Sequence, residues 1–220
     1  KKFDSFGKDE FQELSNYCNN IGIEFMSTGF DVNSVNYIND LVVRHKIASA
    51  DLTNIELIKT IANFNKPVIM STGASTLNEI FTAVKLVKDF GIEDLTLLHC
   101  VLNYPTKLSN ANLWMINYLR ENFKDCNVGY SDHTKFNINV LMTSILLGSK
   151  VIEKHFTLDK TLKGNDHYHA MDTQDLALFN KTINEYQKFI GTKNTEDNLI
   201  LAQKESRLNA RRGVYFQKNV

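Results

Sequence analysis

VIEKHFT, residues 151–157, begins like a buried strand and then carries a glutamate, a lysine and a histidine before it returns to phenylalanine. A short apolar run bounded by turn residues is typical of a strand in a parallel sheet, because such strands are buried on both faces. The same pattern recurs along the chain and predicts six strands, at residues 23–28, 45–50, 67–72, 95–101, 127–132 and 150–156.

Segments of helical periodicity alternate with these strands, which is the order of βα units. Thr76 and Glu79 have the spacing of a capping box, and the helix they begin is predicted to end at Gly91. Two later helices are predicted to end at Gly148 and Gly191, and a helical segment precedes the first strand. We therefore expect the chain to begin partway through a repeat.

Every predicted strand ends in polar side chains. In βα repeats the active-site groups lie at the carboxyl ends of strands; an open sheet gathers them at one switch point, whereas a barrel collects them from every strand. The pattern favours an α/β fold of the (β/α)8 TIM-barrel type, with the first two βα units expected to lie outside this chain. The polar ends are Ser27-Thr28, Ser49 with Asp51, Ser71-Thr72, His99-Cys100 leading to Tyr104, Ser131-Asp132-His133 and Glu153-Lys154-His155.

Composition narrows the class of protein. The 220 residues are 43% apolar and carry 25 acidic and 25 basic side chains, so the net charge is zero. This balance predicts one globular core and neither a nucleic-acid partner nor a membrane surface. Cys18, Cys100 and Cys126 lack CxxC pairing, which favours a reducing compartment, and we expect a cytoplasmic protein.

Two histidines predict a metal site. His133 and His155 close consecutive predicted strands, and neighbouring parallel strands lie about 4.8 Å apart, so the two imidazoles can share one ion. Two neutral histidines with oxygen or water ligands suit Mn²⁺, Fe²⁺ or Zn²⁺. Core packing is the favoured interpretation of His99. A second metal site at His167 and His169 is an alternative to a flexible surface pair, which we favour.

Hydroxyls and lysines at the strand ends predict an anion site. Side-chain hydroxyls, loop N–H groups and helix N-termini suit phosphate or carboxylate, and Lys46 and Lys154 lie beside them. Serine and threonine at these positions also serve as ordinary helix N-caps, and Lys46 also fits a flanking position at the start of its strand. Lys154 is enclosed by apolar residues and is costly to bury unless it is paired.

In their order along the chain these residues resemble the sialic acid synthase family, which includes the legionaminic and pseudaminic acid synthases. The resemblance covers nearly the whole chain, and the combination of YSDHT (130–134) with IEKHFT (152–157) is its most specific part. It implies that residues 1–204 form strands 3–8 of a TIM barrel. Residues 205–220 would be a linker toward a small antifreeze-like domain of a domain-swapped homodimer. The other matching motifs are FMSTGFD, HKIASADLTN, VIMSTGAS, LLHCVLNYPT, GNDHYHAMD and ARRGVY.

The resemblance also implies roles for residues. His133 and His155 would hold a divalent metal, typically Mn²⁺, with Mg²⁺ and Co²⁺ as alternatives. Tyr104 and Asp166 fall where the family meets its sugar. Candidate catalytic residues are His133, His155, Lys154 and Asp51, the last standing where the family usually has a glutamate. The implied phosphoenolpyruvate-binding residues are Thr28, Lys46, Ser49, Ser71, Thr72 and Ser131.

The implied reaction joins phosphoenolpyruvate to an open-chain amino sugar, N-acetylmannosamine or a related diacetamido sugar, and gives a nonulosonate and phosphate. The loop DHYHAMDT (166–173) departs from the family's DHxxSxxP at Ala170 and Thr173, so the acceptor stays open. A metal-dependent barrel aldolase or hydrolase and a non-catalytic sugar-binding barrel are the alternatives. Glu153 and Asp132 flank the two histidines, and each either orients a histidine or pairs with Lys154 or a neighbouring helix. Unpaired sheet edges would make the segment aggregate on its own.

Overall fold

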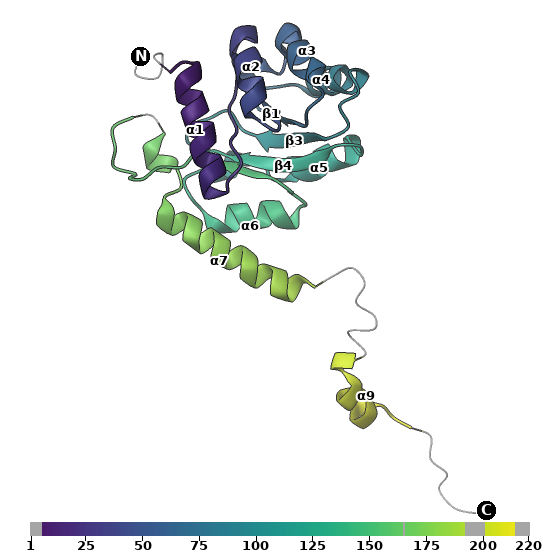
Figure 1. Cartoon of the computed structure of the whole chain (residues 1–220). Coiled ribbons are helices and arrows are strands. Elements are labelled where there is room, and N and C mark those ends of the chain that lie inside the picture. Colours follow the sequence, from purple (N-terminus) through teal and green to yellow (C-terminus); the bar gives the residue numbers. More distant parts are fainter. Residues whose placement is uncertain (1–5, 165, 192–200, 214–220) are drawn as a thin grey trace, which may run out of the picture. The chain divides into compact units, whose positions relative to one another are not determined.

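The computed structural model describes residues 6–164, 166–191 and 201–213. Its ribbon is drawn in Figure 1. The chain divides into two compact units, Lys1–Leu176 and Ala177–Val220. All the strands described below, and all the candidate site residues, belong to the first unit.

The first unit is built on a parallel sheet whose strands follow one another in chain order (Figure 1). Among the described residues this sheet has five strands, and each pairs in parallel with the next. Because all the strands run the same way, their carboxyl ends meet at one edge. The strands are β1 (His45–Ile47), β2 (Val68–Ser71), β3 (Leu95–Cys100), β4 (Asn127–Asp132) and β5 (Ile152–Lys154).

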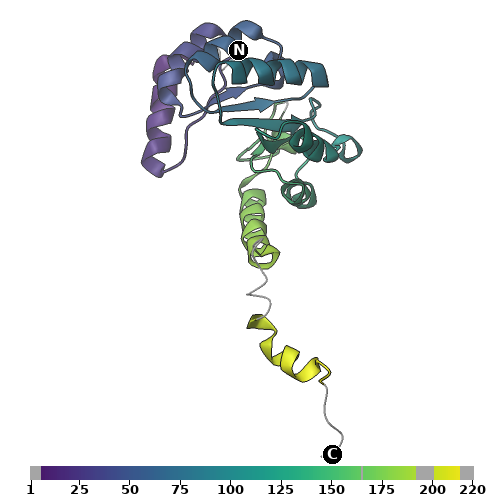
Figure 2. The ribbon, with the colours of Figure 1, turned by 90° about the vertical axis from the view of Figure 1, so that its right-hand side faces the viewer.

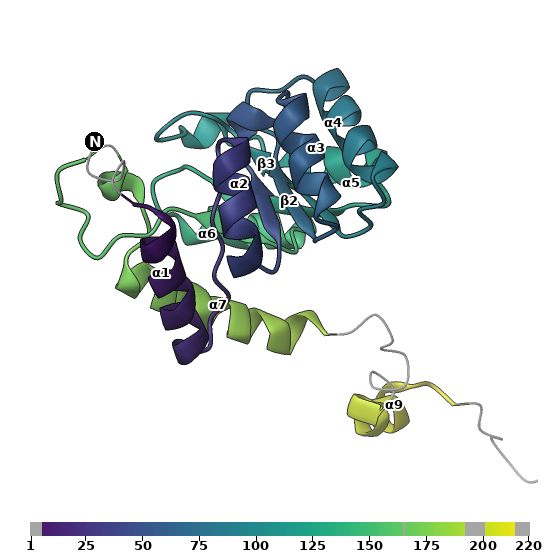
Figure 3. The same cartoon turned by 45° about the horizontal axis from the view of Figure 1, so that its top comes forward.

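Helices lie around the outside of the curved sheet (Figure 2). Figure 3 shows α2, α3 and α4 following one another along the same side, and α5 contacts both β3 and β4. The arrangement is a parallel α/β half-barrel. The α-helices are α1 (Lys8–Ile21), α2 (Val32–Ile38), α3 (Ile55–Asn63), α4 (Leu77–Asp89), α5 (Trp114–Asn122), α6 (Ile138–Leu146), α7 (Thr173–Ile190) and α9 (Lys204–Ala210). Short 3₁₀ turns are η1 (Asn39–Leu41), η2 (Ser49–Asp51), η3 (Leu108–Asn110) and η4 (His167–His169).

The core lies between the sheet and helices α2 to α5. Alternate residues of each strand turn their side chains toward the helices, so the residues between them face the other side of the sheet. This alternation decides which strand-end groups meet. The buried apolar cluster includes Ile47, Met70, Leu97, Val128 and Tyr130 from the strands, and Leu57, Ile61, Val84, Val87, Ile116 and Leu119 from the helices.

The predicted helix ends are confirmed. Thr76 Oγ1 accepts from the Glu79 backbone N–H at 3.3 Å, and Glu79 Oε2 accepts from the Thr76 N–H at 2.6 Å, which completes the capping box. Gly91 follows α4 with φ of 86°, a left-handed conformation that favours glycine. Helices α6 and α7 end just before Gly148 and Gly191, as expected.

Five of the six predicted strands are confirmed, and the prediction at residues 23–28 is wrong. That segment is extended, but no ladder pairs it with β1 or with any other described segment. An apolar run marks a segment that is able to pair; a strand also needs a partner backbone for its N–H and C=O groups. In the predicted linker, α9 covers 204–210, whereas residues 214–220 lie outside the described residues. The boundary at residue 204 stays a prediction.

In the part of the chain that the structure describes, every helix is too short or too polar to cross a membrane.

Candidate functional site at the strand ends

Four side chains from four strands join at the carboxyl edge of the sheet. Lys46 Nζ of β1 donates to Ser71 Oγ of β2 at 2.8 Å and lies 3.6 Å from Glu153 Oε2 of β5. Glu153 Oε1 accepts from Ser131 Oγ of β4 at 2.6 Å. Three of these residues, Lys46, Ser71 and Ser131, are predicted phosphoenolpyruvate-binding residues, and the structure brings them together.

Lys46 is a buried cation whose carboxylate partner, Glu153, is part-exposed. The residue is 8% exposed, and burial lowers the pKa of its ammonium, whereas the Glu153 carboxylate opposes that shift. Its Nζ also donates to the Ile47 carbonyl at 3.1 Å. An ammonium and two hydroxyls held at one edge form charge-assisted hydrogen bonds readily with a phosphate or carboxylate.

Ser49 and Thr72 shape the backbone of the same edge. Ser49 Oγ accepts from the Gly73 N–H at 3.0 Å and donates to Cys100 Sγ at 3.5 Å, and Thr72 Oγ1 donates to the Leu98 carbonyl at 2.9 Å. A Cβ at Gly73 would meet Ser49 Oγ at 2.9 Å, so the close approach there requires glycine. Both hydroxyls contact protein atoms here, and the predicted role of Ser49 and Thr72 in binding phosphoenolpyruvate stays a prediction.

Thr28 and Asp51 are not brought into the cluster. Thr28 is half-buried in the extended segment, and among the described residues no hydrogen bond links it to Lys46. Asp51 belongs to η2; its Oδ1 accepts from Asn54 Nδ2 at 3.4 Å, whereas its Oδ2 is buried without a hydrogen-bond partner. The predicted roles of both residues stay predictions.

His133, at the end of β4, is 6% exposed. Its Nδ1 lies 2.9 Å from the Val101 carbonyl oxygen, a contact that assigns the ring proton to Nδ1 and leaves Nε2 as an acceptor. Burial lowers the pKa of His133, which favours the neutral form that binds metal ions.

His155, at the end of β5, lies beside His133 with the two ring centroids 5.4 Å apart. Its Nδ1 is 3.6 Å from Asp166 Oδ2. Burial lowers the pKa of His155, and the Asp166 carboxylate opposes that shift. In both imidazoles, therefore, an oxygen lies beside Nδ1, and Nε2 is the nitrogen left for a metal ion.

The histidine pair fits a divalent metal ion. Imidazole nitrogens bind such ions at about 2.1 Å, which places two ligating rings about 5 Å apart. The oxygen beside each Nδ1 is the usual arrangement that orients a ligating histidine. Among the described residues no three His, Cys, Asp or Glu side chains are arranged to hold an ion. An ion at this pair would therefore take its other ligands from water or substrate oxygens.

Both predicted sugar-contacting residues lie beside the histidine pair. The Tyr104 ring, in a residue that is 41% exposed, is 4.3 Å from the His133 ring and 5.7 Å from the His155 ring, centroid to centroid. Asp166 lies near His155 because the chain folds back over the strand end, where the Met171 N–H donates to the His155 carbonyl at 2.8 Å.

Lys154 lies on the opposite side of β5 from His155. Its Nζ is 2.8 Å from Asp132 Oδ2 and 2.7 Å from the Thr134 carbonyl. Its side chain is 4% exposed and that of Asp132 is 0% exposed. The Lys154 ammonium, to which the family resemblance assigns a catalytic role, is thus already bound by Asp132 and Thr134. The catalytic role of Lys154 stays a prediction. Glu153 is the residue that faces the cluster.

The interpretation of His167 and His169 as a flexible surface pair is wrong, because His169 is buried. His169 is 1% exposed, and its ring centroid is 5.2 Å from that of His155. His167 instead contacts Thr157, with Nδ1 2.8 Å from Thr157 Oγ1. The bridge between Phe156 and Met171 folds the loop back over the strand end, where His169 is buried. Sequence reasoning missed this residue as part of the cluster.

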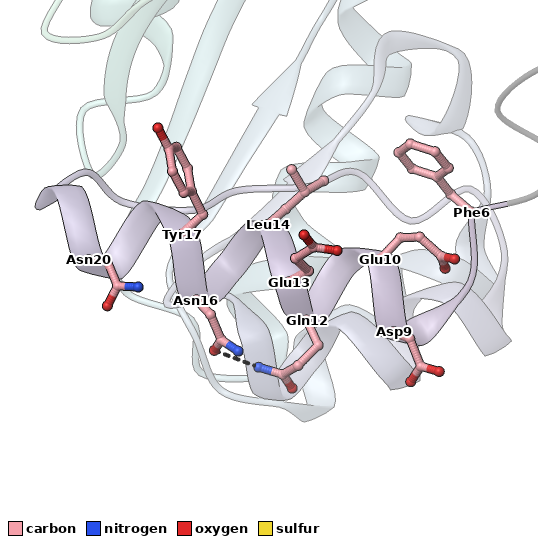
Figure 4. A pocket seen from close by; sticks show the side chains of 9 residues that line it. All are labelled: Phe6, Asp9, Glu10, Gln12, Glu13, Leu14, Asn16, Tyr17 and Asn20. Atoms are coloured by element: carbon pink, nitrogen blue, oxygen red, sulfur yellow. Dashed lines mark hydrogen bonds between the residues drawn. The ribbon is translucent and has the colours of Figure 1, made fainter.

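A separate hollow lies along α1 (Figure 4). It is lined by side chains between Phe6 and Asn20, and the Gln12 amide donates to Asn16 Oδ1 at 3.1 Å within it. None of the strand-end residues contributes to its lining. It is distinct from the candidate site.

Fold and site together define a parallel α/β half-barrel whose polar cluster gathers at the carboxyl ends of the strands. Residues 1–195 match the NeuB family, and the chain belongs to this family. The resemblance to the sialic acid synthases is thereby confirmed.

Three comparisons illustrate the family relationship. An uncharacterised protein of Methanocaldococcus jannaschii is 39% identical over 97% of this chain and 62% of its own length. The N,N'-diacetyllegionaminic acid synthase of Campylobacter jejuni is 39% identical over 82% of this chain and 54% of its own length. The crystal structure of N-acetylneuraminic acid synthetase from Leptospira borgpetersenii, in complex with citrate, superposes with a TM-score of 0.85 at 34% identity, covering 94% of this chain and 73% of that one. The chain thus spans between half and two thirds of these curated relatives.

Proposed function

We propose that the protein containing this chain condenses phosphoenolpyruvate with the aldehyde of an N-acetyl amino sugar, giving a nonulosonate and phosphate. The observation that carries the proposal is the placement of two clusters on one face of β4 and β5. Ser131 and His133 are two residues apart, as are Glu153 and His155, so the anion cluster and the histidine pair adjoin. Membership of the NeuB family supports the same reaction.

The lysine–serine cluster is proposed to bind phosphoenolpyruvate. The Lys46 ammonium and the Ser71 and Ser131 hydroxyls offer donors to its phosphate and carboxylate oxygens. Substrate would replace Glu153 as the partner of Lys46, since that contact is 3.6 Å long and the carboxylate is 40% exposed. Fixed donors of this kind stabilise the negative charge of the reacting phosphate through the reaction.

His133 and His155 are proposed to hold Mn²⁺ or a related divalent ion through Nε2. When bound, such an ion supplies Lewis-acid polarisation of the sugar's carbonyl oxygen. The Val101 carbonyl and the Asp166 carboxylate fix the orientation of the two rings. Tyr104 covers the pair and is positioned to pack against the acceptor.

The proposed chemistry balances with one water. The C2=C3 double bond of phosphoenolpyruvate opens as C3 forms a bond to the aldehyde carbon, whose oxygen takes up a proton. Water adds to the resulting cation at C2 and gives up a proton in turn. The C2–O bond to phosphate then breaks, and inorganic phosphate leaves. This chain's residues contribute orientation, because Lys46 holds one substrate while Tyr104 and the histidine pair hold the other.

The acceptor is proposed to be an N-acetyl or N,N'-diacetyl amino sugar. A relative that matches 82% of this chain is an N,N'-diacetyllegionaminic acid synthase, and another is a pseudaminic acid synthase. Residues 166–173 lie at the end of β5, beside the histidine pair, and depart from the family pattern at Ala170 and Thr173. The acceptor panel below therefore includes both mono- and diacetamido sugars.

The proposal is tested by phosphate release from phosphoenolpyruvate with the full-length protein, Mn²⁺ and a panel of amino-sugar aldehydes. We expect release that needs one acceptor of the panel and stops when the metal is chelated. Turnover of a phosphorylated sugar without phosphoenolpyruvate would instead support an aldolase or hydrolase. Absence of both Mn²⁺ and phosphoenolpyruvate binding in calorimetry would support a non-catalytic barrel.

A further inference from the structure

His169 is a buried polar side chain whose ring atoms lack hydrogen bonds. The residue is 1% exposed, and neither Nδ1 nor Nε2 has a hydrogen-bond partner. Its ring packs among aromatic neighbours, with centroids 5.1 Å from Tyr168, 5.2 Å from His155 and 6.1 Å from Tyr104. A buried imidazole without partners is less stable than an apolar ring in the same space, so its presence calls for a role.

One charged group lies within reach of this ring. Asp166 Oδ1 is 3.4 Å from His169 Nε2, and the second oxygen of the same carboxylate, Oδ2, is 3.6 Å from His155 Nδ1. The carboxylate therefore lies between two imidazoles, one of which belongs to the candidate metal pair. Small rotations of the Asp166 side chain would bring both contacts within hydrogen-bond distance.

Asp166 needs an anchor if it is to orient His155. Its side chain is 49% exposed, so on its own it would sample several rotamers. His169 cannot move in the same way, because it is packed on three rings and sits in the short turn η4. An N–H from this fixed ring would select the Asp166 rotamer that faces His155.

We propose that His169 is a positioning residue that holds Asp166, which in turn orients His155 for metal binding. This inference rests on the proposed function, because it assumes a divalent ion at His133 and His155. A direct role for His169 as a third metal ligand has less support. Among the described residues no group of three potential ligands is arranged around a common ion position.

The test measures Mn²⁺ affinity of the full-length protein by the electron paramagnetic resonance signal of free Mn²⁺. Asp166→Asn should weaken affinity roughly 10- to 100-fold, as expected for a carboxylate that orients a ligating histidine. His169→Phe keeps a buried ring without an N–H and should weaken affinity several-fold. The double variant should bind no more weakly than Asp166→Asn alone, because His169 acts through Asp166.

Two further variants separate positioning from packing. His169→Asn retains an N–H donor and should recover part of the affinity lost in His169→Phe. His167→Leu removes the neighbouring imidazole, which contacts Thr157 rather than the cluster, and should leave Mn²⁺ affinity unchanged. Thermal unfolding of each variant checks that the fold is retained.

The outcomes distinguish this inference from the proposed function. If wild-type protein binds Mn²⁺ and His133→Ala abolishes binding, but His169→Phe binds as wild type does, the positioning role is overturned while the metal site stands. Additive losses in the double variant would also overturn it and would indicate direct ligation. If wild-type protein binds no Mn²⁺, both proposals fail.

Discussion

Glu153 and Lys154 are neighbours in β5, yet they belong to two lysine–carboxylate pairs of opposite character. Lys154 and Asp132 are 2.8 Å apart, with side chains 4% and 0% exposed. Lys46 and Glu153 are 3.6 Å apart, and the Glu153 side chain is 40% exposed. The first pair is closed and the second is open to solvent on one side.

The difference comes from the alternation of the strand. Successive side chains point to opposite faces, so Glu153 joins the cluster with Ser131 while Lys154 turns the other way. Asp132 also accepts from the Tyr130 hydroxyl at 3.0 Å and from the Thr134 N–H at 2.9 Å, so the closed pair is fully partnered. A fully partnered ion pair supports the fold, whereas a loosely partnered cation can exchange its carboxylate for a substrate anion.

Breaking the closed pair should have the largest effect. Lys154→Met leaves the Asp132 carboxylate buried without its cation and should cost about 3–5 kcal/mol of unfolding free energy. Urea unfolding of the full-length protein measures this loss. Folded Lys154→Met protein should bind phosphoenolpyruvate as wild type does. A matched control is Thr76→Ala, which removes a helix cap and should cost about 1 kcal/mol.

A loss no larger than that of the Thr76 control would contradict the structural role of the Lys154–Asp132 pair. Weakened phosphoenolpyruvate binding in the folded variant would show that Lys154 also takes part in the anion site.

Features that depend on local sequence signals could be predicted from the sequence, whereas features that depend on pairing between distant segments could not. Apolar runs and caps were sufficient for five strands and for the ends of α4, because those signals are local. The choice between Asp132 and Glu153 as the partner of Lys154 could not be made from local signals, because it depends on the register that sets Asp132 opposite Lys154. The burial of His169 depends likewise on a bridge between distant residues. The extended segment at 23–28 failed as a strand for the same reason, since pairing is a property of two segments.

Breaking the Lys46–Glu153 pair should change phosphoenolpyruvate binding rather than the free energy of unfolding. Lys46→Met removes the charged donor of the cluster and should weaken phosphoenolpyruvate binding by about 1.5–3 kcal/mol, the usual contribution of a hydrogen bond to a charged group. Isothermal titration calorimetry measures it. Lys85→Met, which removes the lysine of an exposed pair on α4, serves as the control and should bind normally. Equal binding by Lys46→Met and wild type would remove Lys46 from the anion site.

The pH dependence of phosphoenolpyruvate binding should show a smaller effect, whose direction tests the Lys46–Glu153 pair. Burial lowers the pKa of Lys46 and Glu153 opposes this, so phosphoenolpyruvate affinity should fall as pH rises, beginning below the ordinary lysine value of 10.5. Binding needs the protonated ammonium, which is lost as pH rises through the lowered pKa. Glu153→Gln removes the opposing charge and should move the fall to still lower pH. A shift to higher pH in Glu153→Gln would contradict the pairing of these two residues.

The most direct test of the account is Mn²⁺ titration of the full-length protein in three variants. His133→Ala and His155→Ala should each weaken Mn²⁺ affinity by more than the roughly 100-fold that is typical of disturbing only an orienting partner. His45→Ala should bind as wild type does, because His45 is a buried imidazole at the amino end of β1, 3.1 Å from Asn39 Oδ1. Wild-type affinity in both His133→Ala and His155→Ala would contradict a metal site at the strand ends.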